Sequence, residues 1–264
     1  MDLREIIKQN FFDLHLHTTA SDGSFTPSEI VEKAAKKGLE VIAITDHDTI
    51  DGVAEAKLKA IECNITVISG IELTTKYKGR NIDILGYNVH ATQQLEEVMK
   101  RIQTHRMTRA NKIIEKFCQI GIVISKADVE KHSIGGVIAR PHIAKAVVEK
   151  GYANSQQEVF DRYLGDGKPC AMDKIFLSPM QAINLIHQAG GQAVLAHPAL
   201  IRDDNIVREL MQLPLDGIEV WHRKHKKKDI KRYKKIAKKY GKIITGGSDF
   251  HYDGHHMGDF GYHA

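Results

Sequence analysis

Imidazole and carboxylate side chains gather at one kind of position in this sequence, the end of a short apolar segment. Residues 11–23, FFDLHLHTTASDG, end an apolar strand in His15 and His17 and supply Asp22 a turn later. Side chains two apart on a strand point to the same face, so the two imidazoles lie side by side. Their spacing suits a divalent metal ion, although a His-x-His pair alone also fits a polar strand edge.

Other apolar segments end in the same way, and this repetition favours the metal interpretation. The strands expected at 41–45, 65–69, 193–196 and 243–245 each lead into a histidine or an acid, and the alternating strand 81–89 contains an acid. The candidate ligands collected in this way are His15, His17, Asp22, His47, Glu72, Asp83, His197, Asp249 and His251.

These nine candidates are all imidazoles or carboxylates, with no thiolate among them. Such donors are typical of Zn²⁺, Mn²⁺ or Fe²⁺ in hydrolytic sites. Nine ligands are too many for one ion, so we expect two to three divalent metal ions joined by a bridging carboxylate. Clusters of this kind activate water for attack on phosphorus and neutralise charge on the phosphoryl oxygens.

The elements between these candidates alternate between strand and helix. The segments TPSE at 26–29 and SPMQ at 178–181 are capping boxes with proline at the first helical position, and the helices that follow end at Gly38 and Gly190. With a further strand at 217–220, seven strands are expected, and their polar residues collect at the C-terminal ends, where parallel barrels place active sites. The sequence therefore predicts an α/β fold, a TIM-like β/α barrel.

Residues 92–173 break this alternation. They show helical patterns at 95–120, 126–131, 143–151 and 156–164, joined by glycine-containing turns, and no convincing strand. We therefore expect a barrel formed by residues 1–91 and 174–264, with 92–173 as a helical insertion domain. The insertion should cover the C-terminal face of the barrel, because the chain is expected to leave the barrel at that end after residue 89.

The net charge of +5 hides an uneven distribution. Residues 223–242 carry twelve Lys or Arg and a single acid, on an amphipathic helix whose basic side is a solvated face or a nonspecific RNA contact. No apolar run approaches the ~20 residues of a membrane span, which predicts a cytoplasmic protein without membrane contact. The three cysteines show no C-x-x-C spacing and indicate neither a disulfide framework nor a thiolate zinc site.

Five motifs occur in order between residues 12 and 251: DLHLHTTASDG, TDHDT, GIEL, AHP and GSDFH. In order and spacing they resemble the polymerase and histidinol phosphatase (PHP) superfamily. This resemblance implies the PHP fold, a distorted seven-stranded β/α barrel with a trinuclear metal site. The phrases ARPHIA, AGGQAVLAHP and GIEVW are similar to the branch of the 3′,5′-nucleoside bisphosphate phosphatases and 5′-3′ exoribonucleases.

The resemblance also implies how the ligands divide among three ions, with Glu72 as the bridge. The first ion would take His15, His17, Glu72 and Asp249, the second Glu72 and His197, and the third Asp22, His47 and His251. Position 83 departs from the branch, which usually has histidine in a phrase like H-I-L-G where this chain has Asp83. Aspartate has a shorter reach and a harder oxygen, so the metal preference of the second site is open, and His90 is the rival ligand.

Residues outside the metal set are assigned by the same resemblance. Arg140 and His142 within ARPHIA match positions that hold a substrate phosphate, and Lys168 lies in the returning loop. Alternatively, Arg140 pairs with an acid and His142 only starts a helix. His197 is expected to be catalytic as well as a ligand. His225, in the loop before the basic helix, is expected to contact substrate or act as a general acid, or else to be an exposed loop residue.

These features predict a metal-dependent phosphomonoesterase that converts nucleoside 3′,5′-bisphosphates, such as adenosine 3′,5′-bisphosphate, to AMP and phosphate. Short 5′-phosphorylated RNA is a further expected substrate. One alternative is a phosphatase of another small metabolite such as histidinol phosphate, against which the Arg- and His-bearing insertion argues. Another is a nucleic-acid-binding protein that uses residues 223–242, against which the near-complete ligand set argues. No obligate protein partner is evident.

Overall fold

The computed structural model of the chain describes residues 2–8, 11–132, 138–165, 167–172 and 177–262. The chain divides into two units, which we call the barrel unit (Met1–Glu96 with Phe176–Ala264) and the insertion unit (Glu97–Ile175). The predicted domain boundary between residues 173 and 174 lies outside the described residues.

Seven strands form the sheet of the barrel unit, and each pairs with the next along the chain. A parallel bridge between Leu16 and Phe250, with His17 N donating to Phe250 O at 3.0 Å, joins the first strand to the segment after the last. The predicted seven-stranded α/β barrel is therefore confirmed, and it is nearly closed. Its strands are β1 (Phe12–Leu16), β2 (Val41–Ile44), β3 (Thr66–Tyr77), β4 (Arg80–Tyr87), β5 (Gln192–Leu195), β6 (Gly217–His222) and β7 (Ile243–Gly247).

Strand β4 runs antiparallel to both of its neighbours, whereas the pairs β1/β2, β2/β3, β5/β6 and β6/β7 are parallel. It follows β3 through a tight turn at Lys78 and Gly79, whose positive φ angles of 47° and 78° are typical of a two-residue hairpin. The hairpin extends β3 beyond the predicted strand 65–69. As a result β4 begins at the barrel end where its neighbours finish, and Asp83 lies near that end.

The direction of β4 also removes one argument about the insertion. The expectation that residues 92–173 cover the C-terminal face rested on the chain leaving the barrel at that end. Tyr87, the last residue of β4, instead pairs with Gln192, the first residue of β5, so the chain leaves the barrel at the opposite end. That reasoning was wrong, and the covering role stays a prediction without it.

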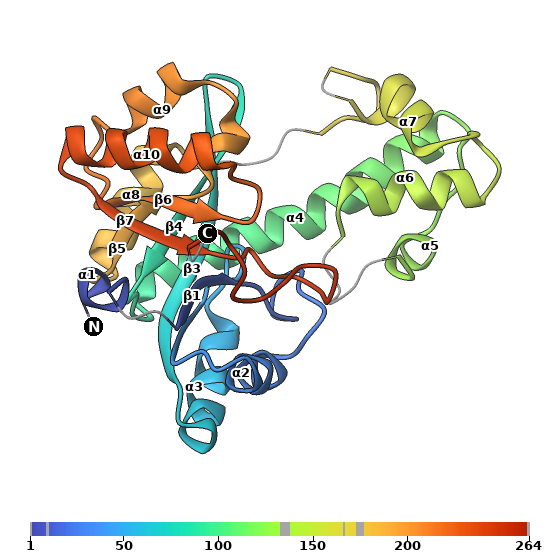
Figure 1. Cartoon of the computed structure of the whole chain (residues 1–264). Helices are drawn as coiled ribbons and strands as arrows, with labels where there is room; N and C mark the ends of the chain where they lie inside the picture. Colours follow the sequence, from blue (N-terminus) through green and yellow to red (C-terminus); the bar gives the residue numbers. More distant parts are fainter. Residues whose placement is uncertain (1, 9–10, 133–137, 166, 173–176, 263–264) are drawn as a thin grey trace. The chain divides into compact units, whose positions relative to one another are not determined.

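Helices flank the strands of the barrel unit (Figure 1). Helices α2 (Pro27–Lys36) and α3 (Asp51–Cys63) pack near β2, α8 (Pro179–Gln188) packs beside β3, β4 and β5, and α10 (Lys227–Tyr240) packs beside β6 and β7. Buried Ile30, Ile42 and Ile44 belong to the apolar core between α2, α3 and the strands. The shorter elements are α1 (Leu3–Ile6), the 3₁₀ turn η2 (Pro198–Ile201) and α9 (Asp204–Leu210).

The ends of these helices follow the signals in the sequence. Thr26 N donates to Glu29 Oε2 at 2.8 Å and Glu29 N donates to Thr26 Oγ1 at 3.2 Å, which completes the capping box of α2. Ser178 and Gln181 form the same pair of bonds ahead of α8. A side-chain cap contributes about 1 kcal/mol to a helix, so these bonds help to fix where each helix begins.

The insertion unit is helical in its described part. Its helices are α4 (Gln93–Gln119), whose first four residues belong to the barrel unit, α5 (Lys126–Glu130), α6 (Arg140–Glu149) and α7 (Gln156–Val159), which continues as a π-helical turn, η1 (Phe160–Leu164). Phe117, Ile143 and Val147 are buried in its own apolar core. Helix α6 begins three residues earlier than predicted, because Pro141 occupies an early helical position where proline is favoured.

Helix α10 carries the basic segment. Tyr233, Ile236 and Ala237 are buried, and the seven lysines of the helix are exposed. The predicted apolar stripe is therefore confirmed. Contact between the basic face and RNA stays a prediction.

Candidate metal centre

All nine predicted ligands lie at one end of the barrel, the end where the parallel strands finish. Ligand atoms that lie within 4.8 Å of one another form three groups, and these share members. The groups are His17, Asp22, His47 and His251; His15, His17 and Asp249; and His15, Glu72 and His197. Sharing of His15 and His17 makes the three groups adjacent, so they offer neighbouring positions for metal ions.

Glu72, on β3, lies at the centre of these groups and is buried. Its Oε2 is 3.4, 3.3 and 3.3 Å from ring nitrogens of His15, His17 and His47, and its Oε1 is 3.0 Å from His197 Nε2. Burial raises the pKa of this carboxyl, but the surrounding imidazoles outweigh burial and hold the pKa well below its ordinary value. A charged carboxylate in contact with members of every group has the position expected of a bridge.

Asp22 lies in the loop after β1 and makes one group more open than the others. Its Oδ1 is 3.3 Å from His251 Nε2 and 3.6 Å from His17 Nδ1, and its Oδ2 is 3.9 Å from His47 Nε2. The side chain of Asp22 is 50% exposed, whereas that of His17 is fully buried. Solvent therefore reaches the cluster from the side of Asp22.

Asp249 lies two residues beyond β7 in a left-handed backbone conformation, with φ of 54°. Its Oδ1 is 3.7 Å from His15 Nε2, 3.5 Å from His17 Nε2 and 3.4 Å from His251 Nδ1. Strand β7 passes so close to β1 that a side chain at Gly247 would collide with His15. Glycine at 247 and the costly φ of Asp249 together bring this carboxylate onto the histidines of β1.

His197 follows β5, and its Nε2 is 3.8 Å from Asp83 Oδ2. Burial lowers the pKa of His197, but Glu72 and Asp83 outweigh burial and raise it to about 9, so a metal ion here would compete with a proton. His90, the rival to Asp83, is exposed and lies at the other end of the barrel, where its backbone N–H bonds to Ala189 O. The structure therefore brings Asp83, and not His90, to the other predicted ligands.

Buried nitrogens without partners test whether these residues fit metal ions. Among the described residues, His15 Nε2, both ring nitrogens of His17, and His47 Nδ1 are buried and accept or donate no hydrogen bond. Each such atom costs about 1–3 kcal/mol unless a ligand satisfies it. Burial and the neighbouring His251 lower the pKa of His17, which favours the neutral imidazole that a metal requires. The donor set fits divalent metal ions.

Residues 13–247 of the sequence match the sequence profile of the PHP domain family. The chain belongs to the PHP domain family. A 5′-3′ exoribonuclease of Haemophilus influenzae is 34% identical over 249 residues, which cover 91% of this chain and 90% of that protein. A 3′,5′-nucleoside bisphosphate phosphatase of Chromobacterium violaceum is 30% identical over 264 residues, which cover 95% and 90%. A solved structure named as a metal-dependent phosphoesterase, from Bifidobacterium adolescentis, matches with a TM-score of 0.76 at 30% identity, covering 94% of this chain and 91% of that one.

Membership of the PHP domain family, together with these relatives, gives the class of reaction. The protein is a metal-dependent hydrolase that acts on phosphoric ester bonds, so the predicted family and reaction class are confirmed. Within the part of the chain that the structure describes, no helix has the length and apolar character needed to cross a membrane.

Two buried acids near the metal end hold loops in place, and neither was among the predicted site residues. Asp46 accepts from Thr18 N and Ser21 Oγ, both at 2.7 Å, and so fixes the loop that carries Asp22. Asp13 accepts from Ser248 N at 2.8 Å beside Asp249. Asp46 lies in the motif TDHDT and Asp13 in DLHLHTTASDG, and their places in these motifs are the signal that could have identified them.

His225 follows β6 in the loop before α10, where the alternatives were a substrate contact, a general acid or an exposed loop residue. It is buried, with Nδ1 2.9 Å from Val220 O and Nε2 3.4 Å from Ala199 N. A carbonyl can only accept, so Nδ1 carries the proton and Nε2 accepts from the η2 backbone. Both ring nitrogens are engaged with backbone atoms, which corrects the expectation of an exposed loop residue and favours a supporting role over a general acid.

The predicted phosphate contacts all belong to the insertion unit. Arg140 Nη1 donates to Leu164 O at 3.1 Å, and the guanidinium lies 6.0 Å from the centre of the Phe160 ring. His142 Nδ1 accepts from Ala139 N at 3.1 Å, which caps the start of α6. Lys168 is exposed. Arg140 and His142 therefore share the first turn of one helix, and their contact with a substrate phosphate stays a prediction.

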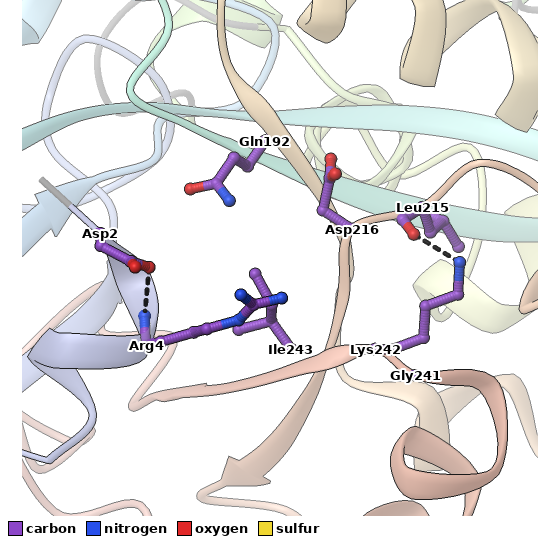
Figure 2. Close-up of a pocket in the computed structure, with 8 residues that line it drawn as sticks. All are labelled: Asp2, Arg4, Gln192, Leu215, Asp216, Gly241, Lys242 and Ile243. Atoms are coloured by element: carbon purple, nitrogen blue, oxygen red, sulfur yellow. Dashed lines mark hydrogen bonds between the residues drawn. The ribbon is translucent and has the colours of Figure 1, made fainter.

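A polar pocket of about 410 Å³ lies at the opposite end of the barrel (Figure 2). Gln192 and Ile243, which line it, are the first residues of β5 and β7, so the pocket lies where the strands begin. Asp2 and Arg4 lie on one side of it and Asp216 and Lys242 on the other, so its two acids and two bases balance. This pocket is separate from the metal end and contains none of the predicted ligands.

Proposed function

We propose that this PHP domain protein removes the 3′-phosphate from nucleoside 3′,5′-bisphosphates, such as adenosine 3′,5′-bisphosphate, using two to three Mn, Fe or Zn ions. The ligands would be the nine residues predicted from the sequence. The observation that carries the proposal is the shared donor set, in which three groups of ligand atoms meet through His15, His17 and Glu72. Divalent ions bound there supply charge neutralisation at the phosphoryl oxygens and activation of water.

The chain itself supplies a rigid frame and one open side. The ligands come from strands or from the short loops directly after them, and the buried acids Asp13 and Asp46 hold two of those loops. A phosphate monoester would enter beside half-exposed Asp22. His197, between Glu72 and Asp83, is the residue that we assign to the reacting phosphoryl group as well as to the metals.

Arg140, His142 and Lys168 would hold the phosphate that is not hydrolysed. The first two stand in the opening turn of α6, where the helix dipole adds positive potential to the guanidinium. Arg140 Nη1 donates to Leu164 O, which fixes the guanidinium at the start of the helix, and the planar geometry of a guanidinium suits phosphate oxygens. Similarity to a 3′,5′-nucleoside bisphosphate phosphatase over 95% of the chain supports a ligand with two phosphates.

Short 5′-phosphorylated RNA is a second substrate that the same chemistry supports. Its first nucleotide has a 5′-phosphate and a 3′-phosphoryl group, and so it differs from a bisphosphate only in the ester that follows. The relative in Haemophilus influenzae is named a 5′-3′ exoribonuclease. A site that recognises the 5′-phosphate and hydrolyses at the 3′ position would accept both.

Release of phosphate or nucleotides from a panel of substrates tests the proposal. The panel holds adenosine 3′,5′-bisphosphate, histidinol phosphate and a short 5′-phosphorylated RNA, each with added Mn²⁺ and with a chelator. We expect Mn²⁺-dependent hydrolysis of the bisphosphate, and of the RNA at a lower or similar rate. Preference for histidinol phosphate would refute the proposed substrate while leaving the reaction class intact. Tight RNA binding with no hydrolysis in Mn²⁺ would refute the enzymatic proposal.

A further inference from the structure

Strand β6 supplies none of the predicted ligands, yet three polar side chains from it or directly after it lie among them. Glu219 and His222 are buried, and Arg223 follows the last residue of the strand. A buried charge is costly unless it is paired, so each of these groups needs a reason to be there. Their contacts give that reason.

A bulge in β6 lets both Glu219 and His222 face the ligands. Glu219 pairs with Thr245 of β7 and Trp221 pairs with the next residue, Gly246, so Val220 is an extra residue in β6. In a regular strand, residues 219 and 222 would point to opposite faces. Trp221 instead packs away from the ligands, with its ring 4.7 Å from Lys234 Nζ of α10.

Val220, the bulged residue, is held by His225. Its carbonyl accepts from His225 Nδ1 at 2.9 Å, while His225 Nε2 accepts from Ala199 N at 3.4 Å. Ala199 lies two residues beyond the ligand His197. His225 therefore ties the bulge of β6 to the turn that begins at His197, which explains why a buried histidine stands at this position.

Glu219 contacts two ligands with its two oxygens. Oε1 accepts from His15 Nδ1 at 3.0 Å, and Oε2 accepts from the backbone N–H of His197 at 2.7 Å. A protonated Nδ1 leaves His15 Nε2 as the nitrogen with a free lone pair, and this is the atom that faces Glu72 and Asp249. The second contact holds His197 at its unusual φ of 24°.

Asp249 is oriented from its other side. His222 Nδ1 accepts from Lys224 N, so Nε2 carries the ring proton and donates to Asp249 Oδ2 at 3.3 Å. Arg223 Nη2 donates to the same oxygen at 3.1 Å. With Oδ2 occupied by two donors, Oδ1 is the oxygen that faces His15 and His17.

We propose that β6 with Arg223 is an orienting strand: Glu219 sets the metal-binding nitrogen of His15 and the placement of His197, while His222 and Arg223 restrict Asp249 to binding through Oδ1. The proposal rests on the ligand set of the proposed function. It assigns no ligand to β6, and it makes Glu219, His222 and Arg223 positioning residues whose loss weakens metal binding without removing a metal-binding atom.

Glu219→Gln tests the first part, because glutamine keeps the size of the side chain and loses the charge that holds His15 Nδ1–H. In titrations of the metal-free full chain with Mn²⁺, affinity at the positions that use His15 and His197 should fall about 10- to 100-fold. The position formed by Asp22, His47 and His251 should keep its affinity. Glu209→Gln, which removes a charge from the outer pair with Lys78, is the matched control and should change nothing.

Nitrogen NMR of the His15 ring gives a reading that does not depend on activity. The wild type should show a single tautomer with the proton on Nδ1, and Glu219→Gln should show a mixture. Unchanged Mn²⁺ affinity, or an equal loss at all positions together with a lower melting temperature, would overturn the orienting role. If His15→Ala keeps all metal, the ligand set itself is wrong; if His15→Ala loses metal and Glu219→Gln does not, only the orienting role is wrong.

Arg223 and His222 are tested against Asp249. Arg223→Gln should weaken Mn²⁺ binding by about tenfold, and Arg223→Lys should restore much of the loss because an ammonium can still donate to Oδ2. His222→Gln, which keeps a donor, should retain the full metal content. Loss of one whole metal equivalent in His222→Gln would show that His222 is a ligand and would overturn its role in the orienting strand.

Discussion

The metal end of the barrel unit and the ARPHIA segment of the insertion unit both hold histidines and charged side chains in place, but they leave them in opposite states. At the metal end, ring nitrogens of His15, His17 and His47 are buried without hydrogen-bond partners among the described residues. In ARPHIA, Arg140 donates to Leu164 O and His142 accepts from Ala139 N.

This difference means that the metal end requires bound ions, whereas the ARPHIA segment is satisfied without a ligand and can bind one in addition. Unpartnered buried nitrogens cost about 1–3 kcal/mol each, so the metal end is stable only when ions satisfy them or when its stability comes from elsewhere in the fold. The polar atoms of ARPHIA already contribute to the start of α6. A phosphate bound there would add to these contacts or exchange with them, and its binding energy would be correspondingly smaller.

Removal of a ligand from the metal end should therefore have the largest effect. Asp249→Asn keeps the shape of the side chain but replaces Oδ1 or Oδ2 with an amide and removes the charge near His15 and His17. We expect loss of bound metal and a fall in kcat/KM of more than the roughly 10- to 100-fold that changes around ligands cause. Metal analysis and phosphate release measure both.

Asp253→Asn is the matched control for this change. Asp253 lies four residues further along and pairs with Lys33 at the surface, 2.8 Å away. Surface substitutions of this kind usually change stability by less than about 0.5 kcal/mol. A variant Asp249→Asn with full metal content and full activity would remove Asp249 from the ligand set.

The candidate ligands could be picked out from the sequence because their signals are local. A His-x-His pair needs only period two along β1, and an acid or histidine directly after an apolar run needs only the position of the strand end. The direction of β4 could not be predicted in this way. Its hairpin turns at Lys78 and Gly79, and a Lys-Gly pair is a weaker turn signal than Asn-Gly or Asp-Gly.

The supporting residues were missed for a different physical reason. Glu219 stands inside an apolar strand, and the bulge at Val220 that aims it and His222 at the ligands depends on pairing with β7. His225 was expected either to contact substrate or to be an exposed loop residue, but its ring is buried against Val220 and Ala199. Such roles depend on contacts between distant segments, which periodicity along one segment does not show.

In the ARPHIA segment, Arg140→Ala should have a smaller and substrate-dependent effect. A charge-assisted bond to phosphate is worth about 1.5–3 kcal/mol, so kcat/KM for adenosine 3′,5′-bisphosphate should fall roughly 10- to 100-fold. Hydrolysis of p-nitrophenyl phosphate should change little, because it has no second phosphate for the guanidinium to hold. Steady-state kinetics on both substrates measure the difference.

Arg162→Ala serves as the control in the same unit, because Arg162 is half exposed and pairs with Glu158 one helical turn away. It should leave both substrates unaffected. Equal losses on both substrates in Arg140→Ala would mean that Arg140 acts on the reacting phosphoryl group or supports the fold. The melting temperature of the variant separates these two explanations, since only the second lowers it.

Removal of metal should distinguish the two regions without any mutation. At a free Mn²⁺ concentration of about 100 times Kd, binding stabilises the folded state by about 2.7 kcal/mol. Backbone amides that exchange with solvent only when the metal site opens should then exchange roughly 100-fold more slowly. The N–H groups of His17 and Glu72, bonded to Phe250 O and Asp46 O, should show this slowing. Amides within α6, at residues 143–147, should exchange at the same rate with Mn²⁺ and with chelator. Equal slowing of exchange in both regions would refute the idea that only the metal end depends on bound ions.

The smallest effects are expected for substitutions of Asp83 and of His90, its rival as a ligand. Asp83 Oδ2 lies 3.8 Å from His197 Nε2, next to the candidate ligands. Asp83→His should therefore retain activity. The metal preference should shift from harder towards softer ions, because an imidazole nitrogen replaces a carboxylate oxygen. His90→Ala should be silent within about 0.5 kcal/mol of stability and should leave metal content unchanged, because His90 is exposed at the other end of the barrel. Metal analysis after loading with an equal mixture of Mn²⁺ and Zn²⁺ measures both variants against the wild type. Loss of one ion in His90→Ala, with none lost in Asp83→Ala, would show that the ligand of the second position has been assigned to the wrong residue.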